Sequence, residues 1–65
     1  MPAYKLTAPR QMGEIPKGFV LQVASPRTPT PDAKDVEAAI IRAGFTDPQS
    51  RSYKASGNWK VEKLG

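Results

Sequence analysis

The segment Phe19-Val20-Leu21-Gln22-Val23-Ala24 gives the strongest indication of the fold. Its odd positions are large and apolar, whereas its even positions form a weaker, mixed face. This alternation is typical of a β-strand with one buried face. We therefore predict a strand over residues 19–24. The side chains that we place in the core are Phe19, Leu21 and Val23.

An earlier segment has the same alternation. Tyr4 and Leu6 share one side of residues 3–7, which predicts a second, shorter strand. The connection over residues 8–17 holds two prolines and a glycine, a composition typical of loops. We therefore predict a first hairpin with a wide turn.

A proline-rich crossover and a helix follow the central strand. Residues 25–31 contain three prolines and cannot continue a sheet ladder, so we predict a crossover that is partly polyproline II. Thr30 or Asp32 can cap a helix, and the apolar spacing that follows predicts this helix over residues 32–43. Gly44 is placed to end the helix in the left-handed conformation.

The last third of the chain is predicted to form a second hairpin, with strands over residues 51–55 and 59–64 and a three-residue loop between them. A three-residue loop places Tyr53 and Trp59 on the apolar face, whereas a two-residue loop would separate them. Since a slip of one residue reverses every side chain, we favour the register that groups the apolar residues. In this register Lys54 lies opposite Lys60.

These elements predict an α+β fold of order ββαββ. Its small, mostly antiparallel sheet carries one helix packed on one face. A chain of 65 residues forms one small domain, here residues 1–65 with the crossover at 25–31. One sheet face stays uncovered, and we take it as the candidate binding site. Its candidate residues are Lys5, Val20, Gln22, Arg51, Lys54, Lys60 and Lys63.

The composition excludes several kinds of chemistry. The chain has no Cys and no His, which removes disulfides, thiolate catalysis, and the commonest metal ligand and general base. Its glycines have neither Walker nor dinucleotide-binding spacing. We therefore expect a protein that is not an enzyme and that binds no cofactor and no metal.

Two kinds of partner fit the charge and size. A core this small, without disulfides, gains stability from a partner, so we expect binding to itself or to another protein through the open sheet face or an edge strand. The alternative is weak, salt-dependent nucleic-acid binding through a basic sheet face, because Lys and Arg outnumber Asp and Glu by 10 to 6. No apolar run approaches the length of a membrane span, so we expect no membrane partner.

Two resemblances add to this interpretation. The segment 19–25, followed by a helix that ends in Ala43-Gly44-Phe45, resembles one half of a SPOR domain, the peptidoglycan-binding module of bacterial division proteins. More of the chain resembles short, basic, uncharacterised proteins of gut Bacteroidetes, through Tyr4-Lys5-Leu6-Thr7, Pro16-Lys17-Gly18 and the closing residues 59–64. The second resemblance implies a bacterial cytoplasmic protein and assigns no functional residue.

Overall fold

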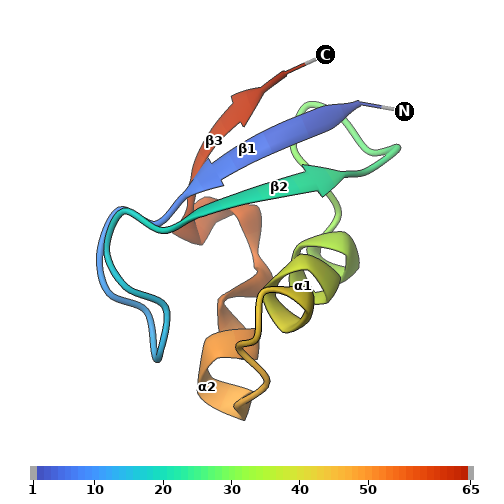
Figure 1. Cartoon of the computed structure of the whole chain (residues 1–65). Helices are drawn as coiled ribbons and strands as arrows, with labels where there is room; N and C mark the ends of the chain where they lie inside the picture. The colour runs from blue at the N-terminus through green and yellow to red at the C-terminus, as the bar shows by residue number, and fades with distance from the viewer. Residues whose placement is uncertain (1, 65) are drawn as a thin grey trace.

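A computed structural model describes residues 2–64 of the chain. Three antiparallel strands form one open sheet in the order β2-β1-β3, and helical segments cover one face (Figure 1). The α+β class, with a mostly antiparallel sheet and a helix on one face, is therefore confirmed. The elements are β1 (Ala3–Thr7), β2 (Val20–Ala24), α1 (Ala33–Arg42), α2 (Pro48–Arg51), the 3₁₀ turns η1 (Ser52–Lys54) and η2 (Ser56–Asn58), and β3 (Lys60–Lys63).

In the first hairpin the buried side chains are those that the sequence predicts. β1 pairs with β2 so that Tyr4 lies opposite Val23 and Leu6 lies opposite Leu21, and all four side chains are buried. Their neighbours along the strands point to the uncovered face. The period of two in the sequence thus places the apolar residues against the helices.

The loop that joins β1 to β2 contributes to the core. Met12 and Ile15 are fully buried and exchange two backbone hydrogen bonds of 2.9 Å. Gly13 lies between them with φ +60°, a conformation that glycine adopts at little cost. The sequence predicts a loop here but does not reveal that two of its apolar side chains face inward.

Helix α1 begins and ends as predicted. The Asp32 side chain accepts a hydrogen bond from the backbone N–H of Lys34, which caps the first turn. At the other end Gly44 has φ +105°, and its N–H donates to the carbonyl of Ile41. The N–H of Phe45 donates to the Ile40 carbonyl, which completes a Schellman ending.

A single buried hydroxyl organises the proline-rich crossover. Ser25 Oγ donates to Asp35 Oδ2 at 2.8 Å. The same oxygen accepts from the backbone N–H groups of Arg27 at 3.3 Å and Asp32 at 3.1 Å. The hydroxyl of Tyr4 also donates to the Arg27 carbonyl at 2.6 Å, which ties the crossover to β1. This segment is therefore held by side chains rather than by a backbone ladder.

The predicted second hairpin is wrong. Residues 51–55, expected as a strand, are helical or turn-like, and β3 pairs with β1 instead. The physical reason lies just upstream, where the carboxylate of Asp47 accepts from the Ser50 N–H at 2.9 Å and Pro48 occupies the first helical position. These two residues start a helix directly before residues 51–55, the segment predicted to be a strand.

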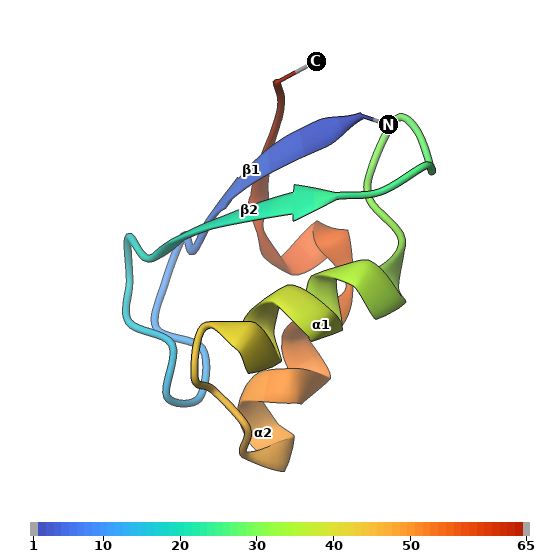
Figure 2. The ribbon, with the colours of Figure 1, turned by 45° about the vertical axis from the view of Figure 1, so that its right-hand side comes forward.

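Trp59 connects this helical segment to the sheet. Its side chain is only 5% exposed, as expected for a core residue. Its indole Nε1–H donates to the Tyr53 carbonyl at 2.7 Å, so the chain between them folds back on itself locally. Helix α1 packs against β2, and η2 contacts β3. Figure 2 shows that α1 and α2 lie on the same side of the sheet.

Candidate functional site

The uncovered sheet face holds four of the seven predicted site residues: Lys5, Val20, Gln22 and Lys60. Lys5 lies in the middle strand between Gln22 and Glu62. An opposite charge therefore lies directly beside this lysine, which offsets its positive charge. The face is mixed in charge, and Val20 is 45% exposed at one corner of it.

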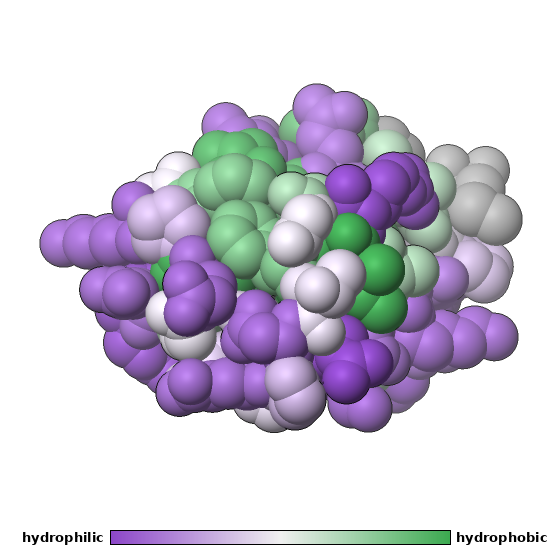
Figure 3. Space-filling model, turned by 60° about the horizontal axis from the view of Figure 1, so that its bottom comes forward, coloured by the Kyte–Doolittle hydropathy of each residue, from purple (hydrophilic) through white to green (hydrophobic). Residues whose placement is uncertain are grey.

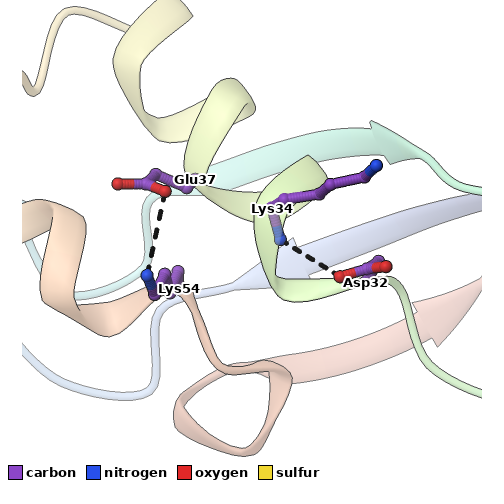
Figure 4. A network of polar contacts seen from close by, with 4 residues as sticks. All are labelled: Asp32, Lys34, Glu37 and Lys54. Atoms are coloured by element: carbon purple, nitrogen blue, oxygen red, sulfur yellow. Dashed lines mark hydrogen bonds and ion pairs between the residues drawn. The ribbon is translucent and has the colours of Figure 1, made fainter.

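The other three predicted residues lie elsewhere. Arg51 ends α2, and Lys63 lies opposite Tyr4, a residue of the helix-covered side. Lys54 lies in η1, and its Nζ is 3.9 Å from Glu37 Oε1 of α1 (Figure 4). The expected opposition of Lys54 and Lys60 is therefore wrong, because the strand that required it is absent. The basic surface expected on the sheet is reduced to Lys5 and Lys60.

Strand β2 lies at an edge of the sheet, so half of its backbone groups have no strand to bond. The Ala8 N–H donates to the Phe19 carbonyl, and the Ser25 N–H donates to the Pro2 carbonyl. The backbone N–H and C=O groups of the odd-numbered residues of this strand therefore point toward β1. Because backbone groups alternate along a strand, the N–H and C=O groups of Val20, Gln22 and Ala24 point away from the sheet.

The two edges of the sheet differ in chemistry. Strand β3 carries charges at three of its four positions, Lys60, Glu62 and Lys63. Strand β2 contains no charged residue and no proline. Charges and prolines are the usual protection of edge strands against pairing with another chain. By this criterion the edge of β2 can pair with a strand of another chain, whereas the edge of β3 is protected against such pairing.

A hollow of about 210 Å³ opens between β2 and α1. Its helix side is formed by small alanines and one cation, Arg42, which is the only charged residue among those lining it. Within residues 2–64 no carboxylate forms an ion pair with this arginine. The full lining is Phe19, Val20, Leu21, Gln22, Ala39, Arg42 and Ala43.

The helical side of the molecule is partly apolar. Figure 3 views the molecule from this side and shows apolar side chains gathered in one area with hydrophilic side chains around them. The rings of Phe19 and Phe45 pack edge to face between β2 and the end of α1, with centroids 5.1 Å apart. This packing fixes Phe19, which borders the hollow.

Sequence reasoning found the β2 part of this site and missed the α1 part. Val20 and Gln22 are among the predicted residues, whereas Ala39, Arg42 and Ala43 are not. Their spacing of three and four residues does place them on one helix face. The sequence does not show, however, which strand that face would approach.

The arrangement combines groups that can bind an extended chain. It offers free backbone groups, an apolar hollow and one guanidinium. Between residues 2 and 64 there is no cluster of acidic side chains that could hold a metal ion. None of the helices in this part of the chain is long and apolar enough to cross a bilayer. No protein-family model, curated protein or solved structure matches the chain.

Proposed function

We propose that this protein is a non-enzymatic interaction module that binds an extended segment of a partner protein as an additional strand along β2. The observation that carries the proposal is the row of outward-facing backbone groups at Val20, Gln22 and Ala24, on an edge without charges. Strand addition of this kind takes its affinity from main-chain hydrogen bonds and its specificity from adjacent side-chain pockets. The hollow beside β2 is such a pocket.

The size of the molecule supports the same function. A domain of 65 residues without disulfides has a small core, and a fourth strand would extend it. Each new main-chain hydrogen bond is worth only about 1 kcal/mol net. We therefore expect a modest affinity that depends on the pocket for selectivity. The resemblance to bacterial cytoplasmic proteins supports a cytoplasmic location, which is part of this proposal.

The charge distribution supports a protein partner over a nucleic acid. A nucleic-acid surface needs several cations on one face. Here Lys5 is flanked by Glu62, and Lys54 is close to Glu37. The other cations are divided among the sheet, both helices and the connecting segments.

The test uses ¹⁵N-labelled protein and peptides selected from a random displayed library. We expect the selected peptides to shift the amide resonances of Val20, Gln22 and Ala24. The Gln22→Pro variant removes an outward-facing N–H without removing a bond to β1, so it should abolish binding while the fold is kept. The matched control is Lys63→Pro, which removes an outward-facing N–H from the β3 edge and should leave binding unchanged.

Several results would overturn the proposal. One is a library that yields no binder, and another is a Gln22→Pro variant that binds peptides as the parent does. Salt-dependent binding of a short single-stranded DNA, with shifts at Lys5 and Lys60, would assign the protein to nucleic acid instead. A dimer that dissociates on Gln22→Pro would assign the β2 edge to a second copy of the chain.

A further inference from the structure

The hollow lies at one end of the β2 edge. It contacts residues 19–22 but not Val23 or Ala24, and on the helix side it contacts the last turn of α1. It can therefore receive one side chain of an added strand rather than a row of them. That side chain would lie at the end of the strand next to Val20.

Pairing along β2 cannot extend beyond this end. The Phe19 N–H donates to the Pro16 carbonyl, and the Gly18 N–H donates to the Ala8 carbonyl. Gly18 has φ +86°, and the chain turns away there. An added segment that continued past Val20 would therefore meet no free backbone donor from these residues. A segment whose backbone hydrogen bonds end at Val20 therefore forgoes no available donor.

Each end of a peptide chain carries a charge, and the charge that lines the hollow determines which end binds there. In antiparallel pairing the carboxyl terminus of the added segment lies beside Val20, whereas in parallel pairing the amino terminus lies there. The cation at this position is Arg42, and within the described residues no carboxylate neutralises it. A guanidinium favours a carboxylate, which it can bind with two hydrogen bonds, and disfavours an ammonium group.

We infer that the partner segment is the carboxyl-terminal end of a protein chain, bound antiparallel to β2. Its terminal carboxylate pairs with Arg42, and its last peptide carbonyl accepts from the Val20 N–H. Its last residue then lies opposite Phe19, so the side chain of this residue points to the helix-covered side and fills the hollow. This inference rests on the strand-addition function proposed above and names the class of ligand for that site.

The size and lining of the hollow set the preferred last residue. A volume of about 210 Å³ is below the ~300 Å³ at which pockets for small-molecule ligands begin. Apart from Gln22 and Arg42 its lining is apolar. We therefore expect Leu, Ile, Val or Phe as the final residue of the ligand, and we expect Asp, Lys or Gly there to be rejected.

The test compares one peptide in two forms. A heptapeptide selected with a free carboxyl terminus is titrated against the protein, and the same peptide is titrated with its terminus amidated. We expect amidation to weaken binding about fivefold, the range of a partly exposed ion pair, and Arg42→Gln to do the same. Because both changes remove one interaction, the amidated peptide should bind the variant no more weakly than it binds the parent.

Two further variants separate this contact from general effects on α1. Lys34→Gln removes a cation from the first turn of the same helix and should leave both titrations unchanged. Ala43→Leu projects a larger side chain from an exposed position into the hollow, so it should shift the preference toward a small final residue. Ala38→Leu, exposed on α1 but outside the hollow, is its control and should have no effect.

The results distinguish failure of this inference from failure of the proposed function. Equal binding of the free and amidated peptides, with shifts still at Val20 and Gln22, would overturn carboxylate recognition and leave strand addition intact. A carboxylate preference that survives Arg42→Gln would show that another group binds the terminus. If neither form shifts the β2 amides, both proposals are wrong.

Discussion

Ser25 is the residue on which the connection between the sheet and α1 depends. Its buried hydroxyl donates to Asp35 and accepts from the backbone N–H groups of Arg27 and Asp32. We expect Ser25→Ala to lower the free energy of unfolding by about 2 kcal/mol, because partly buried polar groups lose their partner. Urea denaturation measures this change.

The control for that substitution is Ser52→Ala. The Ser52 hydroxyl is exposed and donates to the Gln49 carbonyl, so a water molecule can take the place of this donor. Its loss should change the unfolding free energy by less than about 0.5 kcal/mol. Equal effects of the two substitutions would show that Ser25 does not organise the crossover.

Gly13 and Gly18 form a matched pair for a second prediction. Both have positive φ, but a Cβ at Gly13 would lie 2.8 Å from Ser50 Oγ, whereas a Cβ at Gly18 would meet nothing within 4 Å. Alanine at either site costs about 1 kcal/mol in backbone strain. Gly13→Ala adds a steric clash with α2, so its melting temperature should be the lower of the two. The reverse order would contradict the contact between this loop and Ser50.

At the scale of the element, α2 depends on the ionised form of its capping residue. The hydrogen bond from the Ser50 N–H holds the pKa of Asp47 below its ordinary value of 3.8. A carboxyl with a lowered pKa contributes stability above its ordinary pKa, and that contribution is lost as the pH falls through the lower, folded-state value. Asp47→Asn should therefore reduce the loss of stability on acidification below about pH 4.

Stability measured from pH 6 to pH 2 tests this prediction, together with an NMR titration of the Asp47 carboxyl. Parallel pH profiles for the parent and Asp47→Asn would contradict it. So would a carboxyl that titrates at or above its ordinary pKa.

Strand β2 should show two rates of amide hydrogen exchange. The N–H groups of Leu21 and Val23 bond to β1, whereas those of Val20, Gln22 and Ala24 face outward at the edge. We expect the outward-facing amides of the free protein to exchange at least about tenfold faster than the other two. Uniform protection across the five residues would mean that the edge is already occupied in solution.

The elements that local sequence predicted are those whose signals are complete within a few residues. The alternation around Leu21 defines β2, and Asp32 and Gly44 define both ends of α1. The Asp47-Pro48 pair is ambiguous, because the same two residues suit the stop of one helix and the start of the next. The structure resolves this ambiguity through Ser50, whose buried hydroxyl accepts from the Glu14 N–H of a distant loop.

At the scale of the whole molecule, the sheet order follows from contacts that local sequence does not encode. The strand over Lys60–Lys63 pairs with β1, across more than 50 residues of sequence, and not with its neighbour in the chain. For the same reason the candidate site was only half predictable. The alternation placed Val20 and Gln22 correctly, whereas the approach of Arg42 to β2 depends on how the crossover orients α1.

Because the two edges of the sheet differ, strand addition of the proposed kind has one site on this molecule. Growth of a β-structure by successive addition requires two adhesive sides on every unit, and here the charged side of β3 closes one of them. A small, compact chain with an adhesive edge would otherwise be prone to polymerise. With only one such edge, the proposed occupation of β2 would end the association at a single complex, so the feature proposed to allow recognition would also limit it.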